Sequence, residues 1–261
     1  MALGQKNQNR PPITYVQLGR GEDYGFKHNV NEIDAGGKPV RVTKSYDHVT
    51  GIPVGFYVKE ELIYEVAKAL REKNINPQTA DLSKFQEDEI KHVATVMLRD
   101  PDSGEMVGVT FDMHDSLGGK IVGMLNSARL NGTLNQDFNL RTFYAAPHSK
   151  YNDSDKGRSS INMRANGSND NADDIKPVFL AEDGSPLMDA EHPDQFAKLP
   201  MGKVSGRVKG KDVWEFSERN LVITNTAVTL LDHFKKPDSA PADEEVDVNE
   251  AARVAGGAPA P

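Results

Sequence analysis

The stretch HVATVMLRD, residues 92–100, is followed closely by MVGVTFDM, residues 106–113. In both stretches apolar and polar side chains alternate, which is the period of a β-strand with one buried face. The residues DPDSGE between them supply the Asp, Pro, Ser and Gly that a tight turn uses. The sequence therefore predicts a β-hairpin over 91–113.

A helix and two more strands are expected directly after this hairpin. Asp115 or Ser116 can cap the segment LGGKIVGMLNSARL (117–130), whose apolar residues recur at helical spacing before Asn131-Gly132 ends the pattern. DFNLRTFYAAP (137–147) and SSINMRAN (159–166) then read as strands joined by a polar loop. With a curved strand near 49–58 in front, this order is typical of a five-stranded oligonucleotide-binding (OB-fold) barrel.

The remaining segments elaborate this barrel, so a mainly β fold is expected, OB-fold-like, with extra hairpins and two or three helices. Asn166–Pro200, rich in Asn, Asp, Gly and Pro, is expected to be a long surface excursion. The other expected elements are an N-terminal hairpin over 13–28, short strands over 38–61, one amphipathic helix over Lys59–Lys73, a hairpin over 202–218 and a closing helix over Leu221–Phe234.

Composition excludes several classes of protein. The 261 residues contain no cysteine, which removes disulfide scaffolds, thiolate metal sites and cysteine nucleophiles. The sequence contains no run of 18 apolar residues, which is the length needed to span a membrane. Residues 1–12 lack the apolar core of a signal peptide. We therefore expect a cytoplasmic protein without membrane contact.

The formal charge of −8 argues against nucleic acid until its distribution is considered. Residues 237–261 hold six acidic residues against the single base Arg253, about five of the eight negative charges. Because this tail is rich in Ala, Pro, Gly and acids and has no aromatic residue, we expect it to be disordered. The chain thus divides into a flexible arm over 1–12, one nearly neutral domain over 13–236 and an acidic tail.

Catalytic and metal-binding motifs do not emerge from the sequence. The glycines at Gly19, Gly21 and Gly25 match neither a dinucleotide fingerprint nor a phosphate loop. The cluster Asp153–Gly157 lacks the later ligands of a calcium loop, and the seven histidines show no paired ligand spacing. Neither a nucleophile elbow nor a carboxylate cluster for two metals is found. We expect no enzymatic activity, no metal and no cofactor.

Binding of a single strand instead needs aromatic rings that stack on bases and cations that contact phosphates. Several segments interleave the two types, most densely the strand NLRTFYAAP with its following loop. Trp214, between Val213 and Phe216, is more typical of core or interface packing and is left out. The candidate nucleic-acid-binding residues are Tyr24, Phe26, Lys27, Arg41, Lys44, Tyr46, Arg99, Arg141, Phe143, Tyr144, Lys150, Tyr151, Lys156, Arg158 and Arg164.

From 13 to 236 the order of these segments, with the acidic tail after them, resembles bacteriophage single-stranded-DNA-binding proteins. The resemblance implies an OB-fold that coats single-stranded DNA during replication, recombination and repair. It also implies a tail that recruits polymerase or helicase and competes with DNA for the basic groove. This tail ends in Gly256–Pro261 without the terminal aromatic residue often used for partner docking.

One alternative remains at this stage. A phage structural or adaptor protein could use the same strands in a β-sandwich, with the aromatic residues simply in its core. The nearly neutral charge of the domain favours that reading. The oligomeric state is open, and a homo-oligomer is compatible with the sequence.

Overall fold

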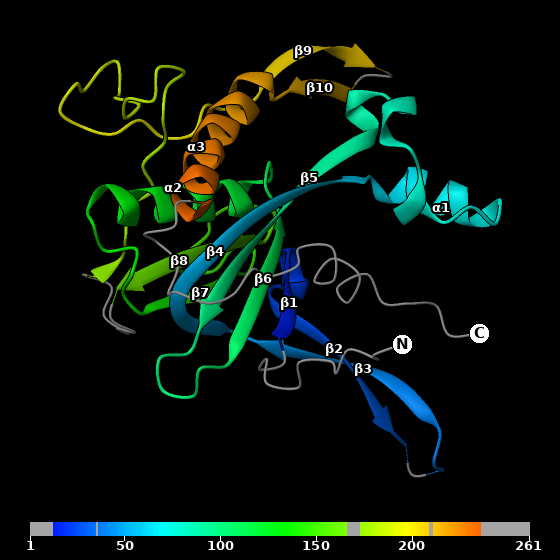
Figure 1. Cartoon of the computed structure of the whole chain (residues 1–261). Helices are drawn as coiled ribbons and strands as arrows, with labels where there is room; N and C mark the ends of the chain where they lie inside the picture. The colour runs from blue at the N-terminus through cyan, green and yellow to red at the C-terminus, as the bar shows by residue number, and fades with distance from the viewer. Residues whose placement is uncertain (1–12, 35, 166–172, 209–210, 236–261) are drawn as a thin grey trace, which may run out of the picture.

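The computed structural model describes residues 13–34, 36–165, 173–208 and 211–235. Its main feature is an eight-stranded sheet that curls into a half-barrel (Figure 1). The strand order is β3-β2-β1-β6-β5-β4-β7-β8. The strands are β1 (Ile13–Gly19), β2 (Gly25–Ile33), β3 (Pro39–Tyr46), β4 (His48–Leu62), β5 (Ile90–Arg99), β6 (Met106–Asp112), β7 (Phe138–Ala145) and β8 (Arg158–Ala165).

The expected central hairpin is confirmed as β5 and β6, paired antiparallel from Val93 opposite Asp112 to Arg99 opposite Met106. The N-terminal hairpin is confirmed as β1 and β2. A pairing that the sequence did not predict joins β1 to β6 in parallel, with Tyr15 opposite Gly108. This parallel pairing attaches the N-terminal strands to the barrel half formed by β4, β5 and β6.

The long strand β4 belongs to both halves of the sheet. Its first residues, His48–Gly51, pair with β7, and Ile52–Leu62 pair with β5. Gly51 has φ +149°, and a Cβ there would lie 3.0 Å from the carbonyl oxygen of Arg99. Only a glycine easily adopts this backbone conformation so close to a neighbouring strand. Gly51 therefore allows β4 to bend from one half of the sheet into the other.

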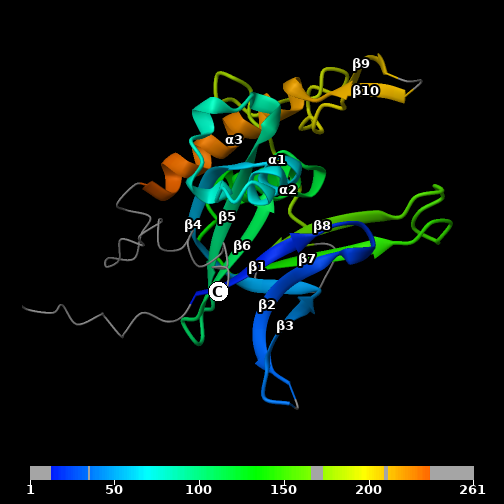
Figure 2. The same cartoon turned by 90° about the vertical axis from the view of Figure 1, so that its right-hand side faces the viewer.

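Two helices cover the inner side of the curled sheet and complete its core (Figures 1 and 2). They are α2 (Ser116–Leu130) and α3 (Ser217–Lys235), both expected from the sequence. Asp115 caps α2 by accepting a hydrogen bond from the Gly118 amide. Fully buried side chains of α2, such as Ile121 and Leu125, pack in one cluster with Ile223 of α3 and with the strands.

The segment expected as a surface excursion is irregular from 173 to 202, but part of it is buried. Val178, Phe179 and Leu180 are almost inaccessible to solvent. The side-chain amide of Asn126 donates to the carbonyl of Val178 at 2.9 Å, and the Leu180 amide donates to the Thr226 hydroxyl at 3.0 Å. This part of the segment therefore packs against α2 and α3 and is not a loose surface loop.

The single helix expected over Lys59–Lys73 is wrong in its first turn. Residues up to Leu62 continue β4, where Lys59 lies opposite Val93, and the helix α1 spans only Tyr64–Glu72. Pairing with β5 satisfies the backbone there, and this tertiary contact overrides the local helical spacing. Short 3-10 helices are η1 (Gly21–Asp23), η2 (Pro77–Thr79), η3 (Leu82–Lys84) and η4 (Glu87–Glu89).

The last two strands, β9 (Lys203–Val208) and β10 (Lys211–Glu215), form a separate two-stranded sheet at the expected position. The described strands thus make one curled sheet and one hairpin, rather than the two packed sheets of a β-sandwich. None of the helices in the described residues is long and apolar enough to cross a membrane. The expected N-terminal arm and acidic tail lie outside the described residues.

Candidate nucleic-acid interface

The curled sheet has one apolar face and one polar face. On β5, Ala94, Val96 and Leu98 point into the core, whereas Lys91 and Thr95 lie on the opposite face. The strand pairings place residues of matching parity on that same side, which we call the outer face. Across β2, β1, β6, β5 and β4 it carries Lys27, Asn29, Asn31, Tyr15, Gln17, Gly108, Thr110, Asp112, Lys91, Val93, Thr95, Met97, Gly55, Tyr57, Lys59 and Glu61.

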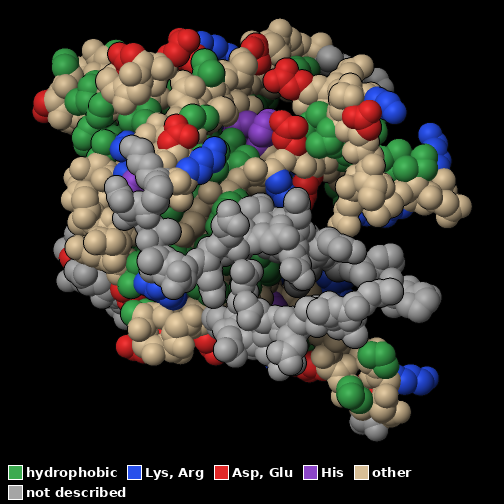
Figure 3. All heavy atoms as spheres, viewed as in Figure 1, with side chains coloured by type: hydrophobic (Ala, Val, Ile, Leu, Met, Phe, Trp, Pro, Cys, Tyr) green, Lys and Arg blue, Asp and Glu red, His purple; other side chains and the backbone are tan. Residues whose placement is uncertain are grey.

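A cleft of about 850 Å³ opens over this outer face, between the β2–β3 hairpin and the start of α1. Five basic and three acidic side chains line it, together with polar amides and hydroxyls. Figure 3 shows blue and red side chains intermixed on the face that carries α1 and the β2–β3 hairpin, where grey atoms do not cover it. The basic residues are Arg20, Lys27, Arg41, Lys59 and Lys91, and the acidic residues are Glu61, Glu65 and Asp112.

Two tyrosine rings lie on glycines of the outer face. Atoms of the Tyr15 ring lie 2.6 Å from the position that a Cβ on Gly108 would occupy. The Tyr57 hydroxyl and ring lie 2.8–3.1 Å from the same position on Gly55. Burial, and for Tyr15 also the nearby Tyr57, raises the pKa of both phenols. Because Gly108 and Gly55 have no side chains, two neutral aromatic rings can lie close to the sheet at these positions.

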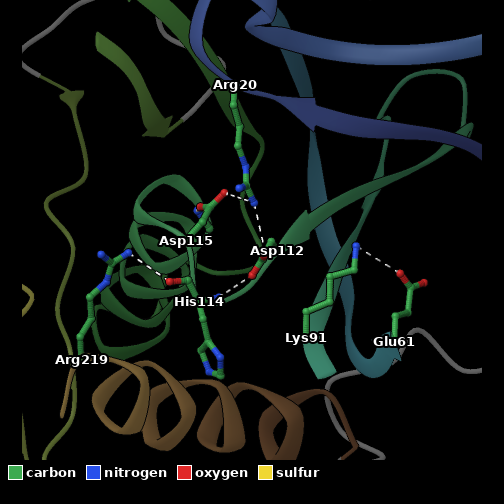
Figure 4. Close-up of polar contacts among 8 residues, drawn as sticks. Arg20, Glu61, Lys91, Asp112, His114, Asp115 and Arg219 are labelled. Carbon is green, nitrogen blue, oxygen red and sulfur yellow. Dashed lines mark hydrogen bonds and ion pairs between the residues drawn. The ribbon is translucent and has the colours of Figure 1, made fainter. Parts of the chain in front are cut away.

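The lysines of the cleft are partly neutralised by carboxylates. Lys59 Nζ lies 2.8 Å from one oxygen of Glu61. Lys91 Nζ lies 3.6 Å from the other oxygen (Figure 4). Lys27 Nζ lies 2.6 Å from Asp23. Arg41 is exposed and has no ion pair within the described part of the chain. Because two lysines share one carboxylate, the region around Glu61 keeps a local excess of positive charge.

Arg20 closes one end of the cleft by joining strand β6 to helix α2. Its guanidinium lies 2.6 Å from Asp115 and 3.3 Å from Asp112 (Figure 4). Burial raises the pKa of Asp115 despite the opposing effects of the Gly118 amide and Arg20. The arginine thus stabilises two acids at the β6–α2 junction and is held there as part of the cleft wall.

A smaller pocket of about 410 Å³ lies near the other half of the sheet. The rings of Tyr24 and Tyr144 stack there at 5.8 Å with an interplanar angle of 16°. Arg141 lies 3.5 Å from Asp47 and also lines this pocket, as does Phe143. The structure therefore brings together five of the residues expected in the interface, although the fifth, Arg164, lines the pocket with a side chain that is only 4% exposed.

The other expected residues are dispersed. Lys27 and Arg41 line the large cleft, whereas Arg99 lies at the end of β5 outside it. Lys44 pairs with Glu32 at 3.0 Å. In the β7–β8 loop, the Lys150 ammonium lies 5.5 Å from the ring of Tyr151, whose surface is 80% exposed. Tyr46, Lys156 and Arg158 are exposed as well.

Two expected contact residues are wrong. Phe26 is fully buried in the core, where no base can reach its ring. Arg164 is also buried, and its Nε donates to Asp174 at 2.7 Å. Both errors have the same cause: residue type and strand alternation suggested an accessible side chain, but the face of each strand that is covered depends on its neighbours.

Sequence reasoning missed Tyr15, Tyr57, Lys59 and Lys91. For Lys59, the available signal was the strand-like alternation of side chains that continues through VKEE (58–61) after Tyr57. The helical spacing of the residues that follow obscured this pattern. The position of Tyr15 depends on the parallel pairing of β1 with β6, for which no local pattern exists. Within the described residues, no group of three or more His, Asp or Glu side chains could hold a metal ion.

Comparison with protein-family models, curated protein sequences and solved structures gives no match. The chemistry of the cleft therefore has to be inferred from its own residues. These offer cations, amides and flat aromatic rings over an extended surface.

Proposed function

We propose that the chain binds single-stranded DNA along the outer-face cleft, largely without sequence specificity and without chemistry. The observation that carries this proposal is the cleft itself, which combines Lys59 and Lys91 with the glycine-seated ring of Tyr15. The ring of Tyr57 lies on the same outer face outside the cleft lining. Aromatic rings can stack on any unpaired base, and cations contact the phosphates between the bases. In a duplex the base faces are already stacked, so such a surface favours a single strand.

The strand order supports an OB-fold as the framework of this proposal. β4, β5 and β6 are followed by α2 and then by β7 and β8, and β4 pairs with both β5 and β7. OB-folds bind oligonucleotides on their second and third strands and on the two adjoining loops. Those strands correspond to β5 and β6, and the loops to 63–89 and 146–157. The cleft lies over β5, β6 and the beginning of the segment 63–89. The exposed Tyr151 belongs to the loop 146–157.

The resemblance to phage single-stranded-DNA-binding proteins supports a role in coating DNA during replication, recombination and repair. The proposed contact residues are those of the cleft, with Tyr24, Arg141, Phe143 and Tyr144 of the smaller pocket as an extension. Engagement of replication proteins by the acidic tail belongs to the same proposal.

The test is a fluorescence-anisotropy titration of labelled oligo(dT) and of a matched duplex with the full chain at two salt concentrations. We expect binding selective for the single strand and weakened by salt. Replacing Lys91 by Ala should reduce the salt slope by about 0.7, the contribution of one phosphate contact on a single strand. Glu61→Gln should act in the opposite direction and tighten binding, because it frees Lys59 and Lys91 from their shared carboxylate.

Lys68→Ala is the matched control. This lysine lies on α1 outside the cleft lining, is 60% exposed and is 3.9 Å from Glu72, so its removal should leave affinity and salt slope unchanged. Equal losses for Lys68→Ala and Lys91→Ala would show non-specific attraction and overturn the placement of the site. No binding of oligo(dT) by the full chain would overturn the proposed function.

A further inference from the structure

Lys120 lies where helix α2 meets the last strand of the curled sheet. Helix α2 packs beside β8 (Figure 1). The Lys120 Nζ lies 3.3 Å from the Ser160 hydroxyl and 3.3 Å from the side-chain oxygen of Asn162, both on β8. The neighbours of Lys120 on the helix, such as Gly119 and Ile121, are buried. The helix therefore holds the ammonium group in a fixed place beside the strand.

The nearby carboxylate of Asp174 orients Asn162 and does not pair with Lys120. The Asn162 amide donates to one oxygen of Asp174 at 2.6 Å, which leaves the Asn162 oxygen facing Lys120. The other oxygen of Asp174 accepts from Arg164 at 2.7 Å. Among the described residues, the contacts of the Lys120 ammonium are the two neutral oxygens and no ion pair. Its positive charge is therefore available to an anion.

Two more cations lie along the same part of β8. Arg158 precedes Ser160 by two residues, so the two side chains share a face of the strand. The segment after Asp174 runs antiparallel to β8 and is joined to it by the Ile175 amide, which brings Lys176 alongside the strand. Both cations are exposed, and neither has an ion pair in the part of the chain that the structure describes.

The three cations repel one another. Burial lowers the pKa of Lys120, and the charge of Asp174 opposes this shift. Repulsion from Lys176 and Arg158 lowers the pKa further. Asp174 is the nearby acid, and it already pairs with Arg164. An anion bound among the three cations would relieve their repulsion and favour the charged form of Lys120.

An aromatic ring and a fourth cation adjoin these residues on β7. Phe143 stands directly opposite Ser160, and Arg141 stands opposite Asn162. Directly opposite residues of two paired strands share a face, and both β7 residues also line the smaller pocket. A ring beside several cations matches a single strand of nucleic acid, in which bases alternate with phosphates. This arrangement favours the phosphates of such a strand over a free phosphate ion.

We propose that Lys120, Arg158 and Lys176 form a phosphate-binding site for single-stranded DNA along β8, next to the smaller pocket. This inference rests on the proposed function and extends the path of the DNA beyond the outer-face cleft, whose described lining includes no residue of β8. Lys120 contacts a phosphate oxygen, and a neighbouring base lies against Phe143. The Ser160 hydroxyl accepts from Lys120 and can donate its own proton to the same phosphate.

The test compares Lys120→Met and Lys120→Arg with the wild-type full chain in anisotropy titrations of oligo(dT). An oligonucleotide of about 30 residues is used, because it exceeds the largest site of one OB-fold, about 16. Methionine keeps the apolar stem and removes the charge, so the salt slope should fall by about 0.7, the value of one phosphate contact. Arginine restores the charge and should keep the slope. Lys68→Ala is again the control, and circular dichroism establishes that each variant is folded.

Acetylation of the lysines of the wild-type chain, mapped by peptide mass spectrometry, gives a second readout without any substitution. Bound oligo(dT) should slow the acetylation of Lys120, Lys176 and Lys91 and leave that of Lys68 unchanged. Inorganic phosphate at the same concentration of phosphate groups should protect none of them.

Three outcomes would overturn the proposal, and they differ in what they say of the proposed function. A wild-type salt slope for Lys120→Met, with Lys91 protected and Lys120 not, would exclude the β8 site and leave binding in the cleft intact. Equal protection of Lys120 by inorganic phosphate would assign the site to a free anion instead of DNA. No binding of oligo(dT) by the full chain would overturn both this site and the proposed function.

Discussion

The ring of Tyr15 owes its place on the outer face to a residue without a side chain. Gly108 lies opposite it on β6, and a Cβ at this glycine would meet the ring at 2.6 Å. The aromatic surface of the cleft therefore depends on two residues: Tyr15 supplies the ring, and Gly108 leaves the space for it.

Tyr15→Ala is expected to weaken oligo(dT) binding, whereas Tyr15→Phe is expected to retain it. Loss of one stacking platform costs about 1–3 kcal/mol, which is roughly a 5- to 150-fold increase in Kd. The phenylalanine keeps the ring and loses only the hydroxyl. Anisotropy titration measures both, and equal weakening by the two substitutions would contradict a stacking role.

Gly108→Ala is expected to displace the Tyr15 ring and weaken binding without removing any contact residue. Gly206→Ala is the matched control, because a Cβ there meets nothing within 4 Å. Titration of both variants, together with circular dichroism, separates a local effect from misfolding. Unchanged affinity of Gly108→Ala would show that the ring position does not matter.

Arg164 contributes to stability rather than to an accessible surface. Its side chain is 4% exposed and that of Asp174 is 17% exposed, so Arg164→Ala leaves a carboxylate largely buried without this partner. We expect the free energy of unfolding to fall by about 3 kcal/mol. Lys203→Ala, which removes an exposed pair, should change it by less than about 1 kcal/mol. Urea denaturation compares the two, and similar losses would contradict this assignment.

Among the elements, the junction of β5, β6, α2 and α3 contains a titratable histidine pair. The rings of His92 and His114 lie 4.9 Å apart, and His114 Nε2 lies 3.0 Å from the Thr224 hydroxyl on α3. Glu60 is 3.4 Å from His92. Burial, followed by the neighbouring His92 and by Arg219, lowers the pKa of His114, while Asp112 opposes the shift.

Acidification is therefore expected to destabilise this junction. In the unfolded chain the His114 imidazole titrates near 6.5, so below about pH 6.5 the unfolded state binds more protons than the folded state. The stability contributed by the neutral ring is present above that pH and is lost as pH falls through the folded pKa. The free energy of unfolding should therefore fall between about pH 7 and pH 5.

Urea denaturation at several pH values measures this dependence, and His114→Gln should reduce its slope. His192→Gln provides the control, since the side chain of His192 is 60% exposed beside Asp189. An identical slope for the wild-type chain and His114→Gln would exclude the junction as the source of the pH dependence.

For the whole molecule, the distribution of charge matters more than its sum. The described domain places basic residues in the cleft, while the six acids of residues 237–261 follow it in sequence. A tethered polyanion can compete with DNA for a cationic groove at high effective concentration.

A chain ending at Lys236 is therefore expected to bind oligo(dT) more tightly than the full chain, with the difference greatest at low salt. The control keeps the length of the tail and replaces its Asp and Glu residues by Asn and Gln; it should bind like the truncated chain. Anisotropy titration at two salt concentrations measures both. Equal affinity of all three chains would exclude competition by the tail.

The sequence by itself determined the local elements of this protein. The alternation in 92–113 specified β5 and β6, and the helical spacing after Asp115 specified α2, because such patterns depend on neighbours along the chain. The basic and aromatic character of Lys27, Arg41, Tyr24 and Tyr144 could also be read from it. These signals were sufficient for a mainly β fold and for a nucleic-acid hypothesis.

Only the tertiary structure decided which side chains share a surface. The parallel pairing of β1 with β6 set Tyr15 over Gly108, the extension of β4 set Lys59 beside Lys91, and core packing buried Phe26. Each outcome depends on contacts between segments distant in the chain, which local periodicity does not encode. A one-residue change of register would move every side chain of a strand to the other face, so only the assembled sheet determines which residues line the cleft.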